Sequence, residues 1–108
     1  MIDQATIAKA AELLLEAAPR GKVILFGSYA RGDAAEGSDV DFLVIEPEVR
    51  DRFEEMLRLR EVLRPLRIPV DVLVASRRHF EYWADTPGTV YYEAAVEGKV
   101  FETLLRTG

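Results

Sequence analysis

The chain has 108 residues, the size of one compact domain, and 49% hydrophobic with 31% charged residues is an ordinary globular composition. The 14 basic and 19 acidic side chains give a net charge of −5, so we expect no non-specific nucleic-acid binding. Without cysteine, the chain can form neither disulfides nor thiolate metal sites. No segment resembles a signal peptide or approaches the ~20 apolar residues of a membrane span. We therefore expect a single cytoplasmic domain over residues 1–108, without membrane contact.

The first half of the chain predicts one helix, a short strand, a loop and a second strand. Apolar residues recur at helical spacing from about Thr6 to Ala18. The apolar run from Val23 to Phe26 is too short for a helix and ends at Gly27-Ser28, which indicates a buried strand. Residues 29–38 predict a helical turn or two and then a loop. After a first acidic pair, the run from Val40 to Ile45 is apolar on both faces, as in a central strand.

The second half continues the alternation of helices and strands. A charged amphipathic helix is expected from Val49 to about Leu63, with Glu54 and Arg58 paired outside. Its inner side is expected to carry Phe53, Met56, Leu57 and Leu63.

A third strand is expected from Val70 to Ala75, and helical segments within Arg77 to Ala84 and Val90 to Glu97. Lys99 to Glu102 fit either a closing strand or a tail. This order predicts an α/β domain of two or three layers, with a small central mixed β-sheet flanked by helices.

Acidic residues stand at the start of two of these strands. Side chains alternate across a strand, so Asp39 and Asp41 should share one face, while Asp71 occupies an otherwise apolar strand. Carboxylates this close repel each other unless a cation lies between them, and oxygen ligands suit Mg²⁺ or Mn²⁺. If the Asp71 strand pairs beside the Asp39 strand, the three acids converge.

The turn after the first strand adds groups that can hold phosphate. Glycine allows close approach of the backbone at Gly27, the Ser28 hydroxyl and nearby amides can bind phosphate oxygens, and Arg31 is the cation within the loop. No Gly-Lys-Ser/Thr sequence of a Walker loop follows. Together with the acids, this pattern favours metal-assisted phosphoryl or nucleotidyl transfer.

Gly27-Ser28, ten intervening residues, Asp39-Val40-Asp41 and the later Asp71 resemble the DNA polymerase beta-like nucleotidyltransferase superfamily. Residues 30–33 (Ala-Arg-Gly-Asp) and Ser38-Asp39 look most like the minimal nucleotidyltransferase (MNT) antitoxins encoded beside HEPN-domain toxins. The resemblance covers most of the chain and implies the nucleotidyltransferase fold.

The resemblance also implies roles and partners. Asp39 and Asp41 would bind two Mg²⁺ ions, Asp71 would complete the metal site and help deprotonate the attacking hydroxyl, and Gly27 and Ser28 would hold the nucleotide triphosphate. Arg31 and Ser38 are further candidates for binding the nucleotide. The implied reaction transfers AMP from ATP to a hydroxyl. In this group the acceptor is a tyrosine of the HEPN toxin, so the chain would be an antitoxin.

Structural interpretations of the same residues stay open. The acids could be turn or strand-edge residues, Gly27-Ser28 a plain turn, and Arg31 a surface partner of Asp33 or Glu36. His79 fits a helix surface. The late aromatic residues fit the core, or a face that binds a partner or a second copy of the chain; they are Phe80, Tyr82, Trp83, Tyr91, Tyr92 and Phe101.

Two further functions compete with protein modification. A non-catalytic antitoxin would bind nucleotide and neutralise its partner by masking it. A small-molecule nucleotidyltransferase is disfavoured by the length of the chain, which has no room for the acceptor domain of kanamycin-type enzymes.

Overall fold

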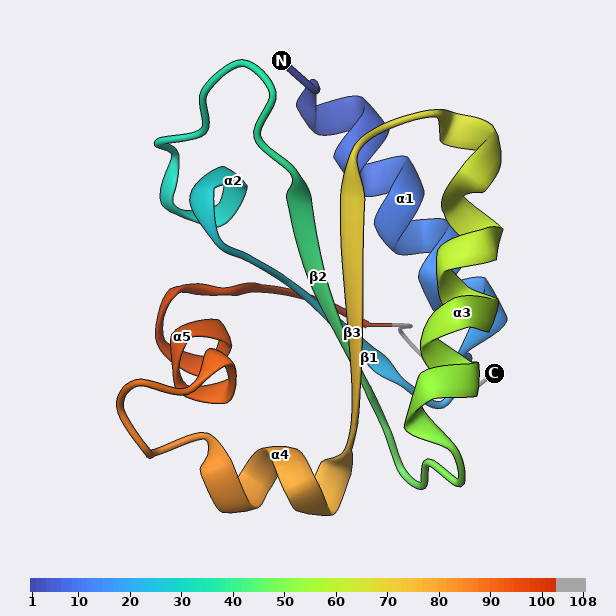
Figure 1. The fold of residues 1–108 in the computed structure, drawn as a ribbon, viewed down its shortest axis with the longest axis vertical. Coiled ribbons are helices and arrows are strands. Elements are labelled where there is room, and N and C mark those ends of the chain that lie inside the picture. The colour runs from blue at the N-terminus through green and yellow to red at the C-terminus, as the bar shows by residue number, and fades with distance from the viewer. Residues whose placement is uncertain (103–108) are drawn as a thin grey trace, which may run out of the picture.

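The computed structural model describes residues 1–102, in which a four-stranded sheet carries helices on both faces (Figure 1). The elements in chain order are α1 (Gln4–Ala17), β1 (Lys22–Phe26), α2 (Ser28–Arg31), β2 (Val40–Glu46), α3 (Arg52–Leu63), the 3-10 turn η1 (Arg64–Leu66), β3 (Val70–Ser76), α4 (Arg77–Trp83), α5 (Val90–Glu97) and β4 (Lys99–Glu102).

The sheet is mixed, with strand order β3-β2-β1-β4. β1 is antiparallel to both β2 and β4, whereas β2 and β3 are parallel and joined through α3. Parallel neighbours need such a crossover, because the chain must return to the same end of the sheet. The predicted α/β class with a small mixed sheet is confirmed, and Lys99–Glu102 form a closing strand.

Polar residues fix the helix starts. The Asp3 carboxylate accepts the backbone N–H of Thr6 at 2.8 Å, so α1 begins at Gln4, two residues before the predicted start. The Thr89 hydroxyl likewise accepts the N–H of Tyr92 and caps α5.

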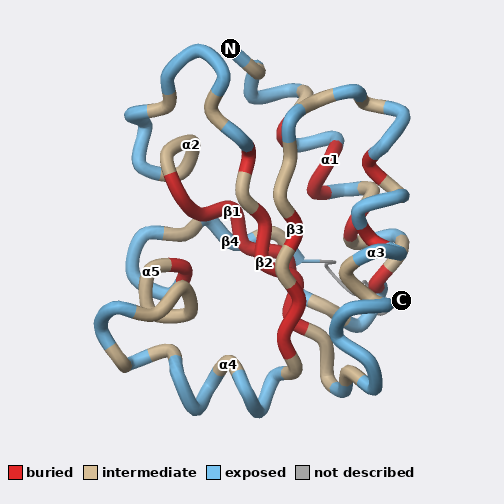
Figure 2. The backbone as a smooth tube through the Cα atoms, viewed as in Figure 1, coloured by how far each residue is buried: buried red, intermediate tan, exposed pale blue. Residues whose placement is uncertain are grey.

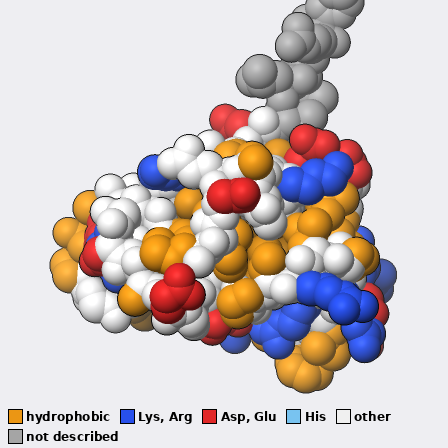
Figure 3. Space-filling model, turned by 90° about the horizontal axis from the view of Figure 1, so that it is seen from above, with side chains coloured by type: hydrophobic (Ala, Val, Ile, Leu, Met, Phe, Trp, Pro, Cys, Tyr) orange, Lys and Arg blue, Asp and Glu red, His pale blue; other side chains and the backbone are white. Residues whose placement is uncertain are grey.

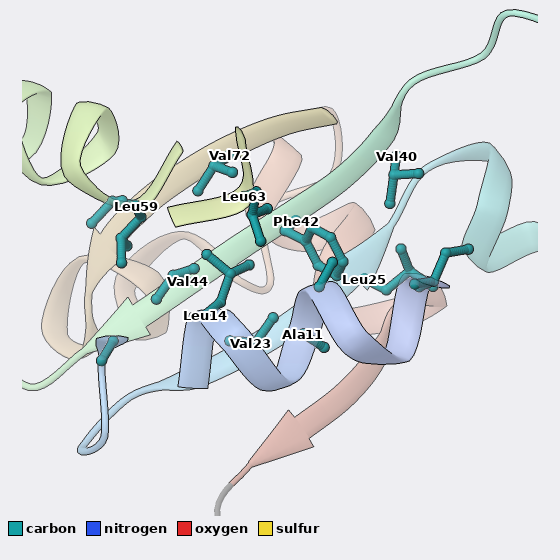
Figure 4. Close-up of a cluster of buried hydrophobic side chains, with 14 residues drawn as sticks. Ala11, Leu14, Val23, Leu25, Val40, Phe42, Val44, Leu59, Leu63 and Val72 are labelled. Carbon is teal, nitrogen blue, oxygen red and sulfur yellow. The ribbon is translucent and has the colours of Figure 1, made fainter. Parts of the chain in front are cut away.

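The larger core lies between the sheet and the helices α1 and α3 (Figure 4). Even-numbered residues of β2 and β3 point to this face, as the alternation of a strand requires. The fully buried side chains labelled there include Leu14, Val23, Val40, Phe42, Val44, Leu59, Leu63 and Val72. Burial is concentrated along the strands and on the inner sides of these helices (Figure 2).

The opposite face carries a smaller core beneath α4 and α5. Its buried members are Ile24, Phe26, Leu43, Ile45, Ala75 and Ala94. Odd-numbered residues of β2 and β3 belong to this face, so Asp41 and Asp71 begin the rows that Leu43 and Ala75 continue.

The inner side predicted for α3 is wrong at two positions. Phe53 is 65% exposed and Leu57 48% exposed, whereas Leu59 and Leu63 are buried and Met56 packs against the core. The helix begins at Arg52 rather than Val49, and its buried stripe follows the 56, 59, 63 spacing.

The predicted ion pair on this helix is also wrong. Arg58 pairs with Glu55 at 2.7 Å, which is one residue closer in the chain than the expected partner Glu54. Glu54 instead supplies the backbone N–H that the capping carboxylate of Asp51 accepts.

His79 is exposed on α4, as expected for a surface helix. Of the late aromatic residues, Tyr82 is 72% exposed, whereas Phe80, Tyr91 and Phe101 pack against the two cores. Within residues 1–102, no helix combines the length and the apolar character that crossing a bilayer demands.

Candidate active site

Two carboxylates stand side by side where β2 and β3 begin. Asp41 and Asp71 are register partners in the parallel pair, so their side chains leave neighbouring strands on the same face of the sheet. The strand pairing on which the predicted convergence of three acids depends is present, and it brings two of them, Asp41 and Asp71, side by side. Seen from this end, acidic side chains are scattered over the surface with hydrophobic ones between them (Figure 3).

Asp39 precedes β2 and is exposed. Its charge contributes to the environment of Asp41: burial raises the pKa of Asp41, and the charges of Asp71, Asp39 and Glu93 raise it further, while Arg31 opposes them. The Asp41 carboxylate therefore lies in the combined field of several acids, in which a cation is stabilised.

Gly27 lies directly against the Asp41 carboxylate. Its φ is +77°, a conformation that favours glycine, and a Cβ at this position would overlap the Asp41 carboxylate and its Oδ2. The turn between β1 and α2 thus packs directly against the acid. A side chain here would displace the carboxylate.

The other predicted nucleotide-binding residues lie on the same turn and the following loop. Ser28 is the first residue of α2, and its carbonyl accepts the N–H of Gly32 at 2.9 Å. The Ser38 hydroxyl accepts the N–H of Ala35 at 3.0 Å and closes the loop before Asp39.

Arg31 lies at the end of α2 and faces carboxylates from two elements. Its Nε is 3.2 Å from Asp33 Oδ2 and 3.8 Å from Glu97 Oε2, and its Nη1 is 3.5 Å from Glu93 Oε1. The expected surface contact with Asp33 is present, but the second carboxylate comes from α5 rather than from Glu36. Arg31 consequently connects α2 to α5 beside Asp41.

Glu93 and Glu97 are site residues that the sequence analysis missed. They lie 52 or more residues after Asp41, and no motif spacing connects them to it. Their separation of four residues on one helix places them on the same side of α5, the one signal that could have paired them. Both line a shallow cavity of about 320 Å³ along α5.

The third acid has a different partner. Arg60 of α3 donates from Nη2 to Asp71 Oδ1 at 3.0 Å. β3 is an edge strand, so a long side chain from the opposite layer can reach its first residues around the edge of the sheet.

The donor set tests whether a divalent metal fits. Across residues 1–102, no three His, Cys, Asp or Glu side chains already stand at metal-binding geometry. The neighbouring residues Asp41 and Asp71 nonetheless supply carboxylate oxygens, and that of Asp41 packs against the Gly27 turn. They fit Mg²⁺, which binds proteins through one or two carboxylates, keeps several waters and takes further ligands from substrate phosphates.

The mixed sheet with helices on both faces defines an α/β domain, in which Asp41 and Asp71 stand at the start of two parallel strands. The chain belongs to the nucleotidyltransferase domain family, whose model matches residues 7–102.

Curated relatives match over shorter segments. A proposed protein adenylyltransferase of Methanocaldococcus jannaschii is 39% identical over 54 residues, which are 50% of this chain and 54% of that protein. A second one from this organism is 39% identical over 62 residues, or 56% of this chain and 62% of that protein. The matched segments thus span little more than half the length of these relatives.

Solved structures share the fold. A proposed nucleotidyltransferase of Sulfolobus solfataricus superposes with a TM-score of 0.62 at 21% identity, covering 90% of this chain and 77% of that one. An MNT antitoxin, solved in complex with the tri-AMPylated HEPN toxin of Shewanella oneidensis, gives a TM-score of 0.59 at 20% identity, covering 94% and 74%. At these identities the likeness shows the fold.

Proposed function

We propose that this chain transfers AMP from ATP to a hydroxyl of a partner protein, and that the partner is a HEPN-type toxin neutralised by the modification. The observation that carries the proposal is the Asp41 carboxylate, which packs against the Gly27 turn of a nucleotidyltransferase domain and stands beside Asp71 in the strand register. The matched relatives and the toxin-bound antitoxin of the same fold support protein adenylylation.

In this proposal the turn and the loop bind the triphosphate. The backbone at Gly27, the Ser28 and Ser38 hydroxyls and the Arg31 guanidinium would hold its oxygens. Arg31 is already positioned beside the acids by Glu93 and Glu97. Asp39, Asp41 and Asp71 would hold Mg²⁺, two ions in the full arrangement or Mn²⁺ in its place, and the metal would neutralise charge on the transferred phosphoryl group.

The acceptor hydroxyl attacks the α-phosphorus of ATP, and the new O–P bond forms as the bond to the bridging oxygen of pyrophosphate breaks. Asp71 receives the proton of the attacking hydroxyl, and pyrophosphate leaves. A tyrosine of the partner is the proposed acceptor. We take residues 1–108 as one such domain.

The test uses the chain copurified with the product of the adjacent gene, Mg²⁺, and ATP labelled at the α- or the γ-phosphate. Retention of the α-label alone on the partner supports nucleotidyl transfer. Asp41→Asn should lower this transfer at least ~100-fold because a metal ligand is lost. Asp85→Asn, an exposed aspartate on the loop after α4, is the matched control and should transfer normally.

A masking antitoxin is the second candidate, in which the ion pair of Asp71 with Arg60 would occupy this carboxylate in place of a metal. It predicts a stable complex that retains neither label and neutralisation that survives Asp41→Asn. That outcome would reject the transferase function.

A further inference from the structure

Arginines of α3 and of the turn η1 that follows it differ in where their side chains bind. Arg58 and Arg64 each pair with a glutamate three residues earlier in the chain, at 2.7 and 2.8 Å. Arg60 instead pairs with Asp71, eleven residues away on β3. It is the α3 arginine whose carboxylate partner lies in the candidate site.

The sequence explains this exception. The positions three and four residues on either side of Arg60 are Met56, Leu57, Leu63 and Arg64, so no acid stands at helical spacing from it. Its guanidinium has no carboxylate within α3 to bind and reaches the edge strand instead. Arg60 therefore pairs with Asp71 because α3 offers it no acidic neighbour at helical spacing.

The pair is poorly suited to stabilising the fold. Its side chains are 43% and 47% exposed, and ion pairs this exposed contribute little to stability. The position of the pair indicates a role in the candidate site instead. Arg60 binds Oδ1 of Asp71, and Asp71 stands beside Asp41 on the neighbouring strand. Among the residues described, Arg60 is the one side-chain donor to this carboxylate.

We propose that Arg60 is a positioning residue: by binding Oδ1 it fixes the Asp71 carboxylate so that Oδ2 serves the metal and the attacking hydroxyl. The inference rests on the proposed function, and it adds a residue from the opposite layer of the domain. Such outer partners orient carboxylate ligands, and their loss typically lowers metal affinity or activity ~10–100-fold.

The test compares Arg60→Gln with Arg64→Gln, which removes an equally charged, exposed side chain of the adjoining turn η1, paired with Glu61 rather than with Asp71. Binding of Mn²⁺ is measured by electron paramagnetic resonance in the presence of a non-hydrolysable ATP analogue. This readout needs no acceptor and no turnover, so it decides the inference even if the wild-type chain transfers nothing. Both variants should keep the wild-type melting temperature to within a few degrees.

Arg60→Gln should weaken Mn²⁺ binding about 10-fold or more, while Arg64→Gln matches the wild type. Where transfer is measurable, its kcat should fall with little change in the KM for ATP, and Arg60→Lys should recover part of the loss. Mn²⁺ binding by Arg60→Gln that equals or exceeds that of the wild type would overturn the inference, because Arg60 would then only compete with the metal for Asp71.

Discussion

The two faces of the sheet use the same strands for different purposes. On the face covered by α1 and α3, the even-numbered residues from Val40 to Val44 and from Val70 to Val74 are all apolar, with Phe42 fully buried among them. On the face covered by α4 and α5, the rows begin with Asp41 and Asp71 and become apolar only afterwards. One face therefore supplies stability, which allows the other to hold charges that oppose it.

The largest expected effect comes from a substitution in the core between the sheet and the helices α1 and α3. Phe42 is fully buried, and Phe42→Ala should lower the free energy of unfolding by about 3–5 kcal/mol, because it removes apolar contacts and leaves a cavity. Urea titration followed by circular dichroism measures the change. A loss below about 1 kcal/mol would contradict the assignment of stability to this face.

Gly27→Ala should affect mainly the other face. The new Cβ would overlap the Asp41 carboxylate at a positive φ, so we expect a loss of about 1–3 kcal/mol in stability and a strong loss of nucleotide binding. Titration calorimetry with an ATP analogue measures the binding. Gly32→Ala is the matched control, since its φ is also positive but no atom lies within 4 Å of the added Cβ.

The Glu46 carboxyl lies on the packed side of the sheet, at the opposite end of β2 from Asp41. Burial, with a hydrogen bond to Glu55, raises the pKa of Glu46 to about 7, whereas hydrogen bonding by Arg58 holds the pKa of Glu55 well below its usual range. The stabilisation by protonated Glu46 is complete below its unfolded pKa and disappears as pH rises through 7.

Between pH 5 and 8, where the contribution of Glu55 stays constant, stability should consequently fall by about 1 kcal/mol after solvent screening. Glu46→Gln should remove this slope, since its amide keeps a donor for Glu55 without titrating. Denaturant midpoints at several pH values measure both chains. If stability changed with pH equally in the wild type and in Glu46→Gln, the decrease could not come from the titration of Glu46.

Asp41→Asn should leave stability at pH 7 unchanged or raise it by up to about 1 kcal/mol. The raised pKa of Asp41 means that its ionised form opposes folding at this pH, because burial and the neighbouring acids disfavour the charge. Thermal unfolding of the two proteins without divalent metal measures the difference. A clear destabilisation would indicate that Asp41 serves packing instead.

The smallest effect is expected on the outer side of α3. Phe53→Ala should change the free energy of unfolding by less than about 0.5 kcal/mol, because this side chain is 65% exposed. Leu63→Ala on the same helix is the comparison and should cost about 2–5 kcal/mol. If both variants lost the same free energy of unfolding, Phe53 would face the core, as the sequence predicts.

Local signals account for what could be predicted. Short apolar runs ended by glycine or proline defined the strands, and their alternation put Asp41 and Asp71 on one face once β2 and β3 paired. The buried stripe of α3 was mispredicted because a highly charged helix has a weak pattern, and tertiary packing rather than local spacing selects Leu59 over Phe53.

Long-range partners carried no such signal. Glu93 reaches Arg31 from α5 and Arg60 reaches Asp71 from α3, contacts that depend on how helices lie over the sheet. A search for charged residues without a partner at helical spacing would have found Arg60. It would still not have named Asp71, since that choice depends on the edge position of β3.

The position of β4 has a consequence for biosynthesis. β1 is an inner strand, yet its second neighbour ends at Glu102, 76 residues after β1 ends at Phe26. At ribosomal rates of about 5–20 residues per second, this interval lasts roughly 4–15 s. During that time the nascent chain presents the apolar strand Val23 to Phe26 with one row of peptide groups unpaired, the kind of edge to which other nascent strands can add. Synthesis of residues 99–102 closes that edge.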